Sequence, residues 1–213
     1  MSVKVCIGVD QSYKRTGISV SEDGKLVSCQ SVKLDKLESK PEKRSVLRAR
    51  FSELLESVLD HHSPEECVVV LERVRTFSQQ FLSVPYIKSM GALNAVVSDE
   101  AWYHGVQCYN VDTRAWKHGV VGTSKPAKPG SADMKFASHF QVDDKKAPTA
   151  RWVYENYKEM FKENAILEVA GRRKRGTFIS RDGTRCEIDD DLCDSACISL
   201  SWFKMDSSKF QLE

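Results

Sequence analysis

The sequence of 213 residues lacks the features that mark membrane, secreted and zinc-binding proteins. No apolar run approaches the ~18 residues of a membrane span, and the N-terminus lacks the basic region and apolar stretch of a signal peptide. The seven cysteines include no C-x-x-C pair, and Cys6, Cys67 and Cys108 lie within apolar runs. This usage argues against a disulfide framework or structural zinc. We therefore expect a soluble cytoplasmic protein that binds no membrane.

The sequence also has little net charge, which is only +2, so its bulk charge does not indicate a nucleic-acid partner. The distribution of charge is more informative. Residues 33–50, 114–146 and 172–187 each carry an excess of four basic residues. Cations clustered beside an acidic centre suit a polyanion held around bound metal. The alternative is that these runs are solvated faces.

The first thirty residues have the pattern of three short strands. Apolar residues alternate with others from Val3 to Asp10, which is the period of a strand. A second strand is expected over residues 16–21. The Asp23-Gly24 pair is a strong turn signal, so residues 25–32 should return antiparallel. We predict a three-stranded antiparallel meander.

Downstream, helical and strand patterns alternate. The short apolar run 67–71 predicts a buried central strand, and a parallel partner at 106–111 needs a crossover helix, which residues 85–103 supply. Further helices are expected at 42–61, 112–117, 134–140, 148–161 and 189–205. The chain is predicted to be a single α/β domain over residues 1–213, with a mixed five-stranded sheet flanked by helices. A basic loop at 119–132 and a basic hairpin at 172–188 are expected as insertions.

Four carboxylates stand out by their positions. Asp10 ends the first strand and Glu72 ends the central strand. Asp191 and Asp194 are three residues apart at a helix start, so they share one face. Open α/β sheets place ligand sites outside the carboxyl ends of their parallel strands. If strands one and four are neighbours, these acids meet there.

Carboxylates forced together repel each other, and divalent cations relieve that repulsion. Oxygen ligands favour Mg²⁺, with Mn²⁺ as a substitute, and two such ions can catalyse phosphodiester hydrolysis. Singly, each acid also has a structural interpretation: Asp10 as a turn residue, Glu72 as a partner of Arg73 or Arg75, and Asp191 as part of a helix cap. Together they predict a metal site.

Four segments resemble, in order, the motifs of RuvC-type Holliday-junction resolvases of the RNase H-like superfamily. IGVDQSYKRTGISV begins at Ile7 and is similar to the first motif, and VVVLERV from Val68 is similar to the glutamate-bearing strand. WKHGVVGTSKPAKPGSADMKFASHF from Trp116 resembles the lysine-containing region, and DDDLCDSACIS from Asp189 resembles the closing D-x-x-D-A helix. The resemblance covers most of the chain.

The resemblance implies an RNase H-like fold, a homodimer, two Mg²⁺ ions per active site and paired nicks across a four-way DNA junction. By position, the metal ligands would be Asp10, Glu72, Asp191 and Asp194. Asp189 and Asp190 remain alternatives to Asp191. Lys117, or a loop lysine such as Lys125 or Lys128, would steady the scissile phosphate. No nucleotide cofactor is implied.

The chain also departs from the family. The usual Pro-Gly after the first aspartate is Gln11-Ser12, and Arg75 stands where family members carry an aromatic residue, so Phe77 or Phe81 becomes a candidate for stacking at the junction. These changes suggest a divergent member, such as those encoded by bacteriophages and acting in the host cytosol. The remaining DNA contacts are expected from basic side chains, mostly to phosphates: Lys125, Lys128, Lys135, Arg172, Arg173, Lys174 and Arg175.

Two other functions stay open on sequence alone, and a third is disfavoured. A flap or fork nuclease would share the fold and differ in substrate. A DNA-binding scaffold would use the acids structurally. A sugar-kinase or actin-like domain has a similar first hairpin but needs a second repeat of the fold, for which 213 residues leave no room.

Overall fold

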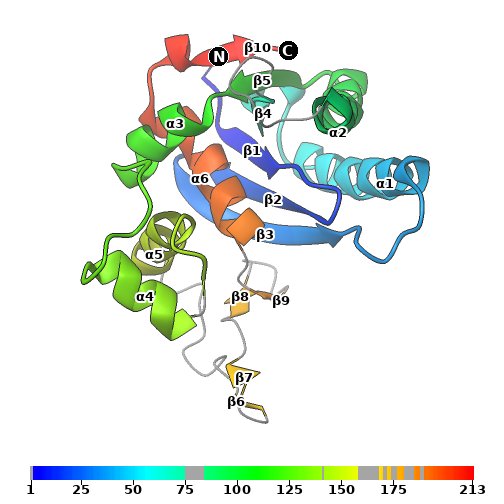
Figure 1. Cartoon of the computed structure of the whole chain (residues 1–213). Coiled ribbons are helices and arrows are strands. Elements are labelled where there is room, and N and C mark those ends of the chain that lie inside the picture. The colour runs from blue at the N-terminus through cyan, green and yellow to red at the C-terminus, as the bar shows by residue number, and fades with distance from the viewer. Residues whose placement is uncertain are drawn as a thin grey trace.

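The computed structural model describes residues 2–74, 84–140, 142–157 and 190–213 and, between 158 and 189, the backbone of four short strands. Its centre is a six-stranded mixed sheet in the order β10-β5-β4-β1-β2-β3. Helices cover both faces of this sheet (Figure 1). The architecture is α/β, as the sequence predicts.

The opening meander forms as expected. β1 (Val5–Asp10) pairs antiparallel with β2 (Arg15–Glu22), and β2 pairs antiparallel with β3 (Lys25–Lys33). Asp23 and Gly24 turn the chain with φ of 48° and 75°, as a two-residue hairpin turn requires. The register places Asp10 opposite Gly17.

β4 (Cys67–Glu72) lies between β1 and β5 (Gln107–Val111) and runs parallel to both. The expected neighbour relation of the first and fourth strands is confirmed. The prediction of five strands was wrong, because β10 (Phe210–Leu212) adds a sixth, antiparallel to β5. This strand has three residues, two of them exposed, so it is too short for an alternating pattern.

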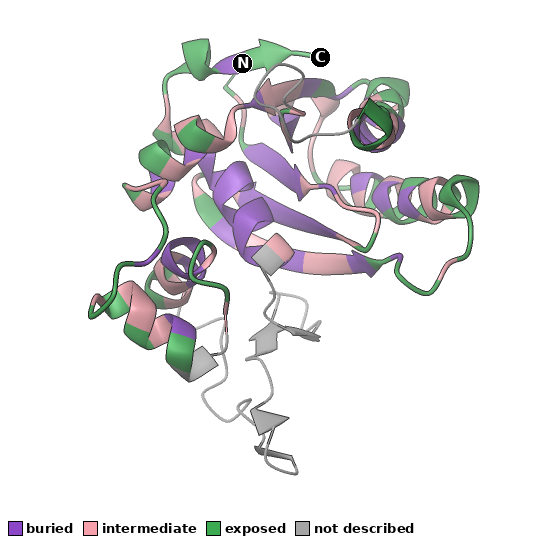
Figure 2. Ribbon diagram, viewed as in Figure 1, coloured by how far each residue is buried: buried purple, intermediate pink, exposed green. Residues whose placement is uncertain are grey.

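One face of the sheet is covered by α1 (Lys40–Leu59) and α2 (Val84–Tyr103). The other is covered by α6 (Asp190–Lys204), against which α5 (Ala147–Asn156) packs. Because both faces are covered, the strands β1, β2 and β4 are almost continuously buried (Figure 2). The six cysteines among the described side chains are buried and form no disulfide, as expected for small core residues.

α6 lies unusually close to β1 and β2. A Cβ added to Gly8 would stand 2.3 Å from the backbone nitrogen of Ser199, and one added to Gly17 would stand 2.2 Å from the carbonyl oxygen of Asp191. Hydroxyl pairs cross the interface at 2.6 Å, from Ser19 to Ser195 and from Ser21 to Ser199. Two glycines therefore set the depth at which α6 sits.

The rest of the chain connects these layers. α3 (Thr113–Trp116) continues into a π-helical turn, η2 (Lys117–Val121), and α4 (Ala132–Phe140) follows, so the loop expected at 119–132 is irregular only between these elements. Of the basic hairpin, β8 (Thr177–Ile179) and β9 (Arg185–Glu187) pair antiparallel, and its turn lies outside the described residues. The shorter elements are η1 (Pro64–Glu66), β6 (Glu168–Val169), β7 (Arg172–Arg173) and η5 (Ser207–Lys209).

Within the described parts of the chain, no helix is both long and apolar enough to cross a membrane.

Candidate active site

Asp10 and Glu72 end two neighbouring parallel strands. Val9 of β1 is registered with Leu71 of β4, so the next residue of each strand is a carboxylate at the same edge of the sheet. Both side chains line an open cavity of about 280 Å³ at this edge. The edge is the carboxyl end of the parallel strands, where α/β proteins bind ligands.

α6 brings two further carboxylates to this edge. Asp194 lies on α6 one to two turns before the close contact at Ser199, and its side chain is only 4% exposed. Its Oδ1 atom is buried and has no hydrogen-bond partner. Asp191, half-buried at the helix start, is near enough to Asp10 to raise the pKa of that carboxyl. The structure therefore gathers the four acids that the sequence singles out.

Burial raises the pKa of Asp10 well above its usual value, and repulsion from Glu72 and Asp194 raises it further. The pKa of Glu72 is also raised, first by burial and then by Asp194. Each ionised acid disfavours the others, which is the electrostatic condition that a bound cation relieves.

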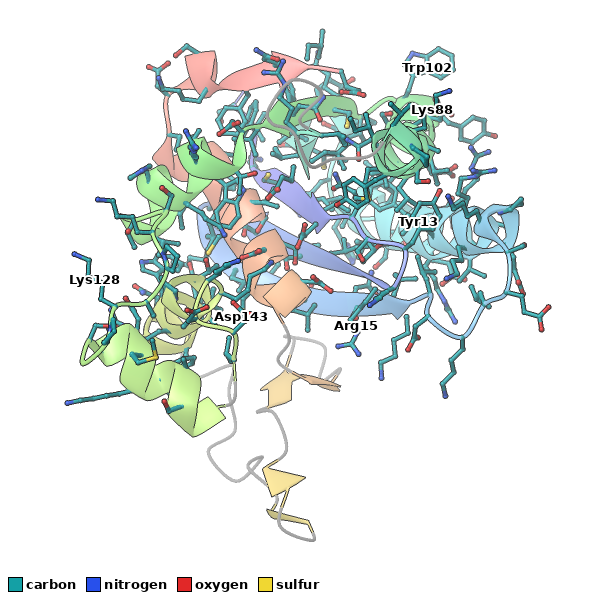
Figure 3. The ribbon with its side chains drawn as sticks, in the orientation of Figure 1. Tyr13, Arg15, Lys88, Trp102, Lys128 and Asp143 are labelled. Carbon is teal, nitrogen blue, oxygen red and sulfur yellow. The ribbon has the colours of Figure 1, made fainter. Side chains whose placement is uncertain are left out.

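Lys146 provides the cation that the described structure places among these acids. It stands at the start of α5 and forms an ion pair with Asp194. Burial lowers the pKa of Lys146, but attraction by Asp194 and Asp10 outweighs burial and raises that pKa above its usual value. The segment carrying Asp143 and Lys146 runs beside the first turns of α6 (Figure 3).

The carboxylate of Glu72 is held by two donors from α3. Thr113 Oγ1 donates to Oε1 at 2.8 Å, and the indole Nε1 of the fully buried Trp116 donates to Oε2 at 3.1 Å. Gln11 Nε2 donates to the main-chain oxygen of Glu72 at 2.8 Å. These bonds fix the direction of the carboxylate, much as outer residues orient the ligands of metal centres.

Sequence reasoning missed Lys146, Thr113 and Trp116 as site residues. Lys146 lies at the end of a basic run that had been counted, but no motif separates it from its neighbour Lys145. Thr113 was expected only as part of the helix at 112–117. Trp116 heads the lysine-containing motif, and a tryptophan beside a conspicuous lysine was the one available signal.

The predicted lysines lie farther out. The Lys117 ammonium stands 5.0 Å from the centre of the Trp116 ring, on the side chain that holds Glu72. Lys125 and Lys128 are exposed between η2 and α4, and Lys135 is exposed on α4. None of these three contacts a carboxylate of the site in the part of the chain described.

The remaining predicted residues are only partly covered. Arg172 and Arg173 form β7, of which the backbone alone is described. Asp190 begins α6, and its side chain is likewise not described. Four other predicted or alternative DNA contacts and one alternative metal ligand lie outside the described residues: Phe77, Phe81, Lys174, Arg175 and Asp189.

The chemical type of the ligand atoms at this site suits a divalent metal. All donors are carboxylate oxygens, and the buried Oδ1 of Asp194 has no hydrogen-bond partner. As the side chains stand, however, no three described metal-ligating residues are close enough to enclose an ion. Lys146 is ion-paired with Asp194, and Thr113 and Trp116 donate hydrogen bonds to the carboxylate of Glu72. Metal binding thus requires Lys146 to leave Asp194, whereas each oxygen of Glu72 can accept from Thr113 or Trp116 and still offer its second lone pair to a metal.

No protein-family model and no curated protein matches the sequence. Solved structures do. The chain is similar to Thermus thermophilus RuvC, with 18% identity, a TM-score of 0.59 and coverage of 98% of this chain and 99% of that one. It is equally similar to T. thermophilus RuvC in complex with a Holliday junction substrate, with 18% identity, a TM-score of 0.61 and 99% coverage of both chains.

Yeast mitochondrial Holliday junction resolvase Ydc2 also matches, with 14% identity and a TM-score of 0.47 over 93% of this chain and 77% of that one. Sequence identities of 14% and 18% support a comparison of folds and no more. The two Thermus matches span nearly the whole of both chains, so the similarity is one of the overall fold. The chain therefore has the RNase H-like fold of RuvC-type Holliday-junction resolvases.

Proposed function

We propose that this protein is a metal-dependent endonuclease that resolves Holliday junctions or closely related branched DNA. The observation that carries the proposal is the gathering of Asp10, Glu72 and Asp194 at the carboxyl edge of β1 and β4. A structure of the same fold was determined with a Holliday junction substrate, which supports branched DNA as the ligand.

In this proposal Asp10, Glu72, Asp191 and Asp194 hold two Mg²⁺ ions, and Mn²⁺ can substitute. The ions supply charge stabilisation for phosphodiester hydrolysis. Thr113 and Trp116 keep the carboxylate of Glu72 in place, and Lys146 leaves Asp194 to contact the scissile phosphate. A lysine near developing negative charge stabilises the transition state.

Two protomers are needed to nick two strands of one junction, and the two-fold symmetry of a homodimer matches that of a four-way junction. We propose α2 as the dimer surface, because Trp102 and Tyr103 on it are 81% and 77% exposed. Figure 3 shows Trp102 pointing away from the molecule. Large exposed apolar side chains of this kind mark interaction sites.

The DNA arms would reach the active site over basic surfaces. Lys125, Lys128 and Lys135 lie exposed on the η2–α4 side of the site. We propose that they contact phosphates, and that Arg172, Arg173, Lys174 and Arg175 do the same. Phe77 is proposed to stack on a base at the branch point.

The decisive experiment compares nicking of synthetic four-way, three-way, flap and linear duplex DNA in Mg²⁺ and in EDTA. We expect paired nicks in the four-way junction with Mg²⁺ and none in EDTA. Asp10→Asn should reduce the rate at least ~100-fold, the scale for loss of an electrostatic group in an active site. Asp60→Asn, exposed at the end of α1, is the matched control and should cleave normally.

Each alternative has its own result. Faster cleavage of flaps or three-way forks would reassign the substrate and keep the chemistry. Tight junction binding with no cleavage in either Mg²⁺ or Mn²⁺ would identify a scaffold. Undiminished nicking by Asp10→Asn would remove the carboxylate centre from the mechanism.

A further inference from the structure

A second basic surface lies beside the candidate site, on the side away from α4. Its cations come from the β1–β2 loop, the end of β3 and the start of α1, and we refer to them as the loop-1 cluster: Lys14, Arg15, Lys33, Lys36, Lys40 and Lys43. The proposed function leaves these residues without a role. They include the beginning of the first basic run in the sequence.

Three chain segments converge on Tyr13 to build this cluster. The backbone nitrogen of Leu34 donates to the carbonyl oxygen of Lys14 at 2.8 Å, which ties the β1–β2 loop to the end of β3. From α1, Lys43 Nζ donates to the carbonyl oxygen of Tyr13 at 3.2 Å. Lys40 Nζ lies 5.6 Å from the centre of the Tyr13 ring. The cluster is therefore a built surface rather than a chance run along the chain.

The cations outnumber the acids on this surface. Asp35, Glu38 and Glu42 are the carboxylates of the same segment, three against six cations. Glu42 is partly used locally, because its Oε2 accepts from the backbone nitrogen of Glu38 at 3.2 Å. The positive end of the 20-residue helix α1 also lies here. Lys14, Lys33 and Lys36 are exposed, so their charges face solvent.

The cluster lies next to the carboxylates. Arg15 is paired with Lys33 across β2 and β3, and it is two residues before Gly17, which pairs with Asp10. Two strand residues span ~7 Å, or about two steps of 3.4 Å along a DNA strand. In Figure 3 Arg15 points away from the lower edge of the sheet, and Lys128 lies on the opposite side of α6. The acids thus lie between two basic surfaces.

We infer that the loop-1 cluster binds the phosphates of the DNA strand immediately beyond the scissile phosphate. This inference rests on the proposed nuclease function and adds to it a binding surface with named residues. DNA that enters over Lys125 and Lys128 leaves over Lys14 and Lys33, so the strand crosses the carboxylates between two sets of cations. The contacts are to phosphates, so they add affinity without sequence preference.

The test is the salt dependence of junction binding in EDTA, where the DNA stays uncut. The triple variant Lys14→Gln, Lys33→Gln, Lys36→Gln removes three exposed charges from the loop-1 cluster. Each lost phosphate contact lowers the slope of log K against log salt by about 0.9. We expect the slope to fall by about 2 to 3 and the affinity at low salt to fall by at least about tenfold.

The matched control is Lys25→Gln, Arg50→Gln, Lys209→Gln, which removes the same charge from exposed positions elsewhere. Lys25 is at the opposite end of β3 from Lys33, about 26 Å away. The control should keep the wild-type slope. If the Gln variant is poorly folded, the variant Lys14→Arg, Lys33→Arg, Lys36→Arg, which keeps the three charges, is measured as well and should show the wild-type slope.

Equal slopes for the cluster variant and the wild type, with both folded, would overturn the inference. So would equal losses in the cluster and control variants. Wild-type nicking separates the two hypotheses: if the wild-type protein nicks the junction in Mg²⁺ and the cluster variant keeps its slope, the nuclease assignment stands and the loop-1 surface does not.

Discussion

Asp10 is placed where burial and like charge both oppose its ionised form. The pKa of its carboxyl is raised well above the usual value by burial and then by Glu72 and Asp194. An acid whose pKa is raised on folding makes the folded state less stable as pH rises through the interval between its unfolded and folded pKa values. The site thus costs stability at neutral pH when no cation is bound.

Asp10→Asn should therefore stabilise the metal-free protein while it abolishes cleavage. About 1 kcal/mol of added stability would raise Tm by about 2–4 °C for a chain of this size. The gain should be present at pH 7 and disappear below about pH 4, where the aspartate is protonated in both states. Thermal unfolding in EDTA at several pH values measures it. A variant less stable than the wild type at pH 7 would contradict this view of the site.

Lys146 and Lys117 compete for the role of the phosphate-contacting lysine. Lys146 contacts Asp194, whereas Lys117 lies over the ring of Trp116. We expect Lys146→Met to lower the single-turnover nicking rate about 100-fold with little change in junction affinity, the scale for losing one charge-stabilising donor. Lys117→Met should change the rate only a few-fold. The opposite order would assign the phosphate contact to Lys117.

Trp116 acts on the reaction through Glu72. Trp116→Phe keeps an aromatic ring in the core and removes the indole donor to Oε2. Loss of such an outer partner costs about 10–100-fold in metal affinity or activity. The Mg²⁺ concentration for half-maximal nicking should rise, and excess Mg²⁺ should recover part of the rate. A lower rate at unchanged Mg²⁺ dependence would mean that Trp116 has a packing role alone.

At the scale of elements, the contact between α6 and the strands β1 and β2 sets the geometry of the site. Gly8 and Gly17 leave the helix backbone in contact with the strand backbone. The hydroxyl pairs of Ser19 with Ser195 and of Ser21 with Ser199 satisfy the polar groups buried there. Because α6 carries Asp191 and Asp194, this contact fixes their distance from Asp10.

Gly8→Ala should push α6 away from the sheet. The new methyl group would meet backbone atoms of Ser199 at 2.3 Å, and overpacking of this kind costs about 1–3 kcal/mol or more. Tm should fall by at least about 3 °C, and nicking should fall with it. Gly91→Ala is the control, because a Cβ there meets nothing within 4 Å and alanine favours the interior of α2. Equal effects of both substitutions would refute the close-contact explanation.

Much of this framework could be predicted from sequence because its elements are long and periodic. The Val3 to Asp10 alternation, the Asp23-Gly24 turn and the apolar run ending at Glu72 all gave the observed strands. β10 was missed because three residues carry no period. The π-helical turn at Lys117–Val121 was missed because its residues have no pattern distinct from a loop.

The candidate site was predictable in part for a similar reason. Asp10 and Glu72 could be placed, since strand ends are visible in the sequence and parallel neighbours share an edge. Lys146 could not, because its position depends on how α5 packs against α6, which is a tertiary contact without local signal. Trp116 and Thr113 likewise reach Glu72 only through a tertiary contact between α3 and the end of β4, which the local sequence does not indicate.

At the scale of the whole molecule, cation binding should be visible as stability. A ligand that binds only the folded state adds about 2.7 kcal/mol at 100 times its Kd, which corresponds to a rise in Tm of about 5–10 °C. Mg²⁺ and Mn²⁺ should both raise Tm of the wild type. The rise should be absent in Asp10→Asn and retained in Asp60→Asn. An equal rise in all three proteins would indicate non-specific ion effects.

The backbone contact at Gly8 and Gly17 also limits where the protein can adjust itself. At these two points no side chain lies between α6 and the strands, so the helix cannot move closer there, and moving away would separate it from the sheet. The four acids are then a fixed frame, and adaptation to different DNA shapes is left to the opposite wall, where Lys146 stands between α4 and α5. Changes in substrate range during evolution should accordingly collect in residues 117–157, while the frame stays as it is.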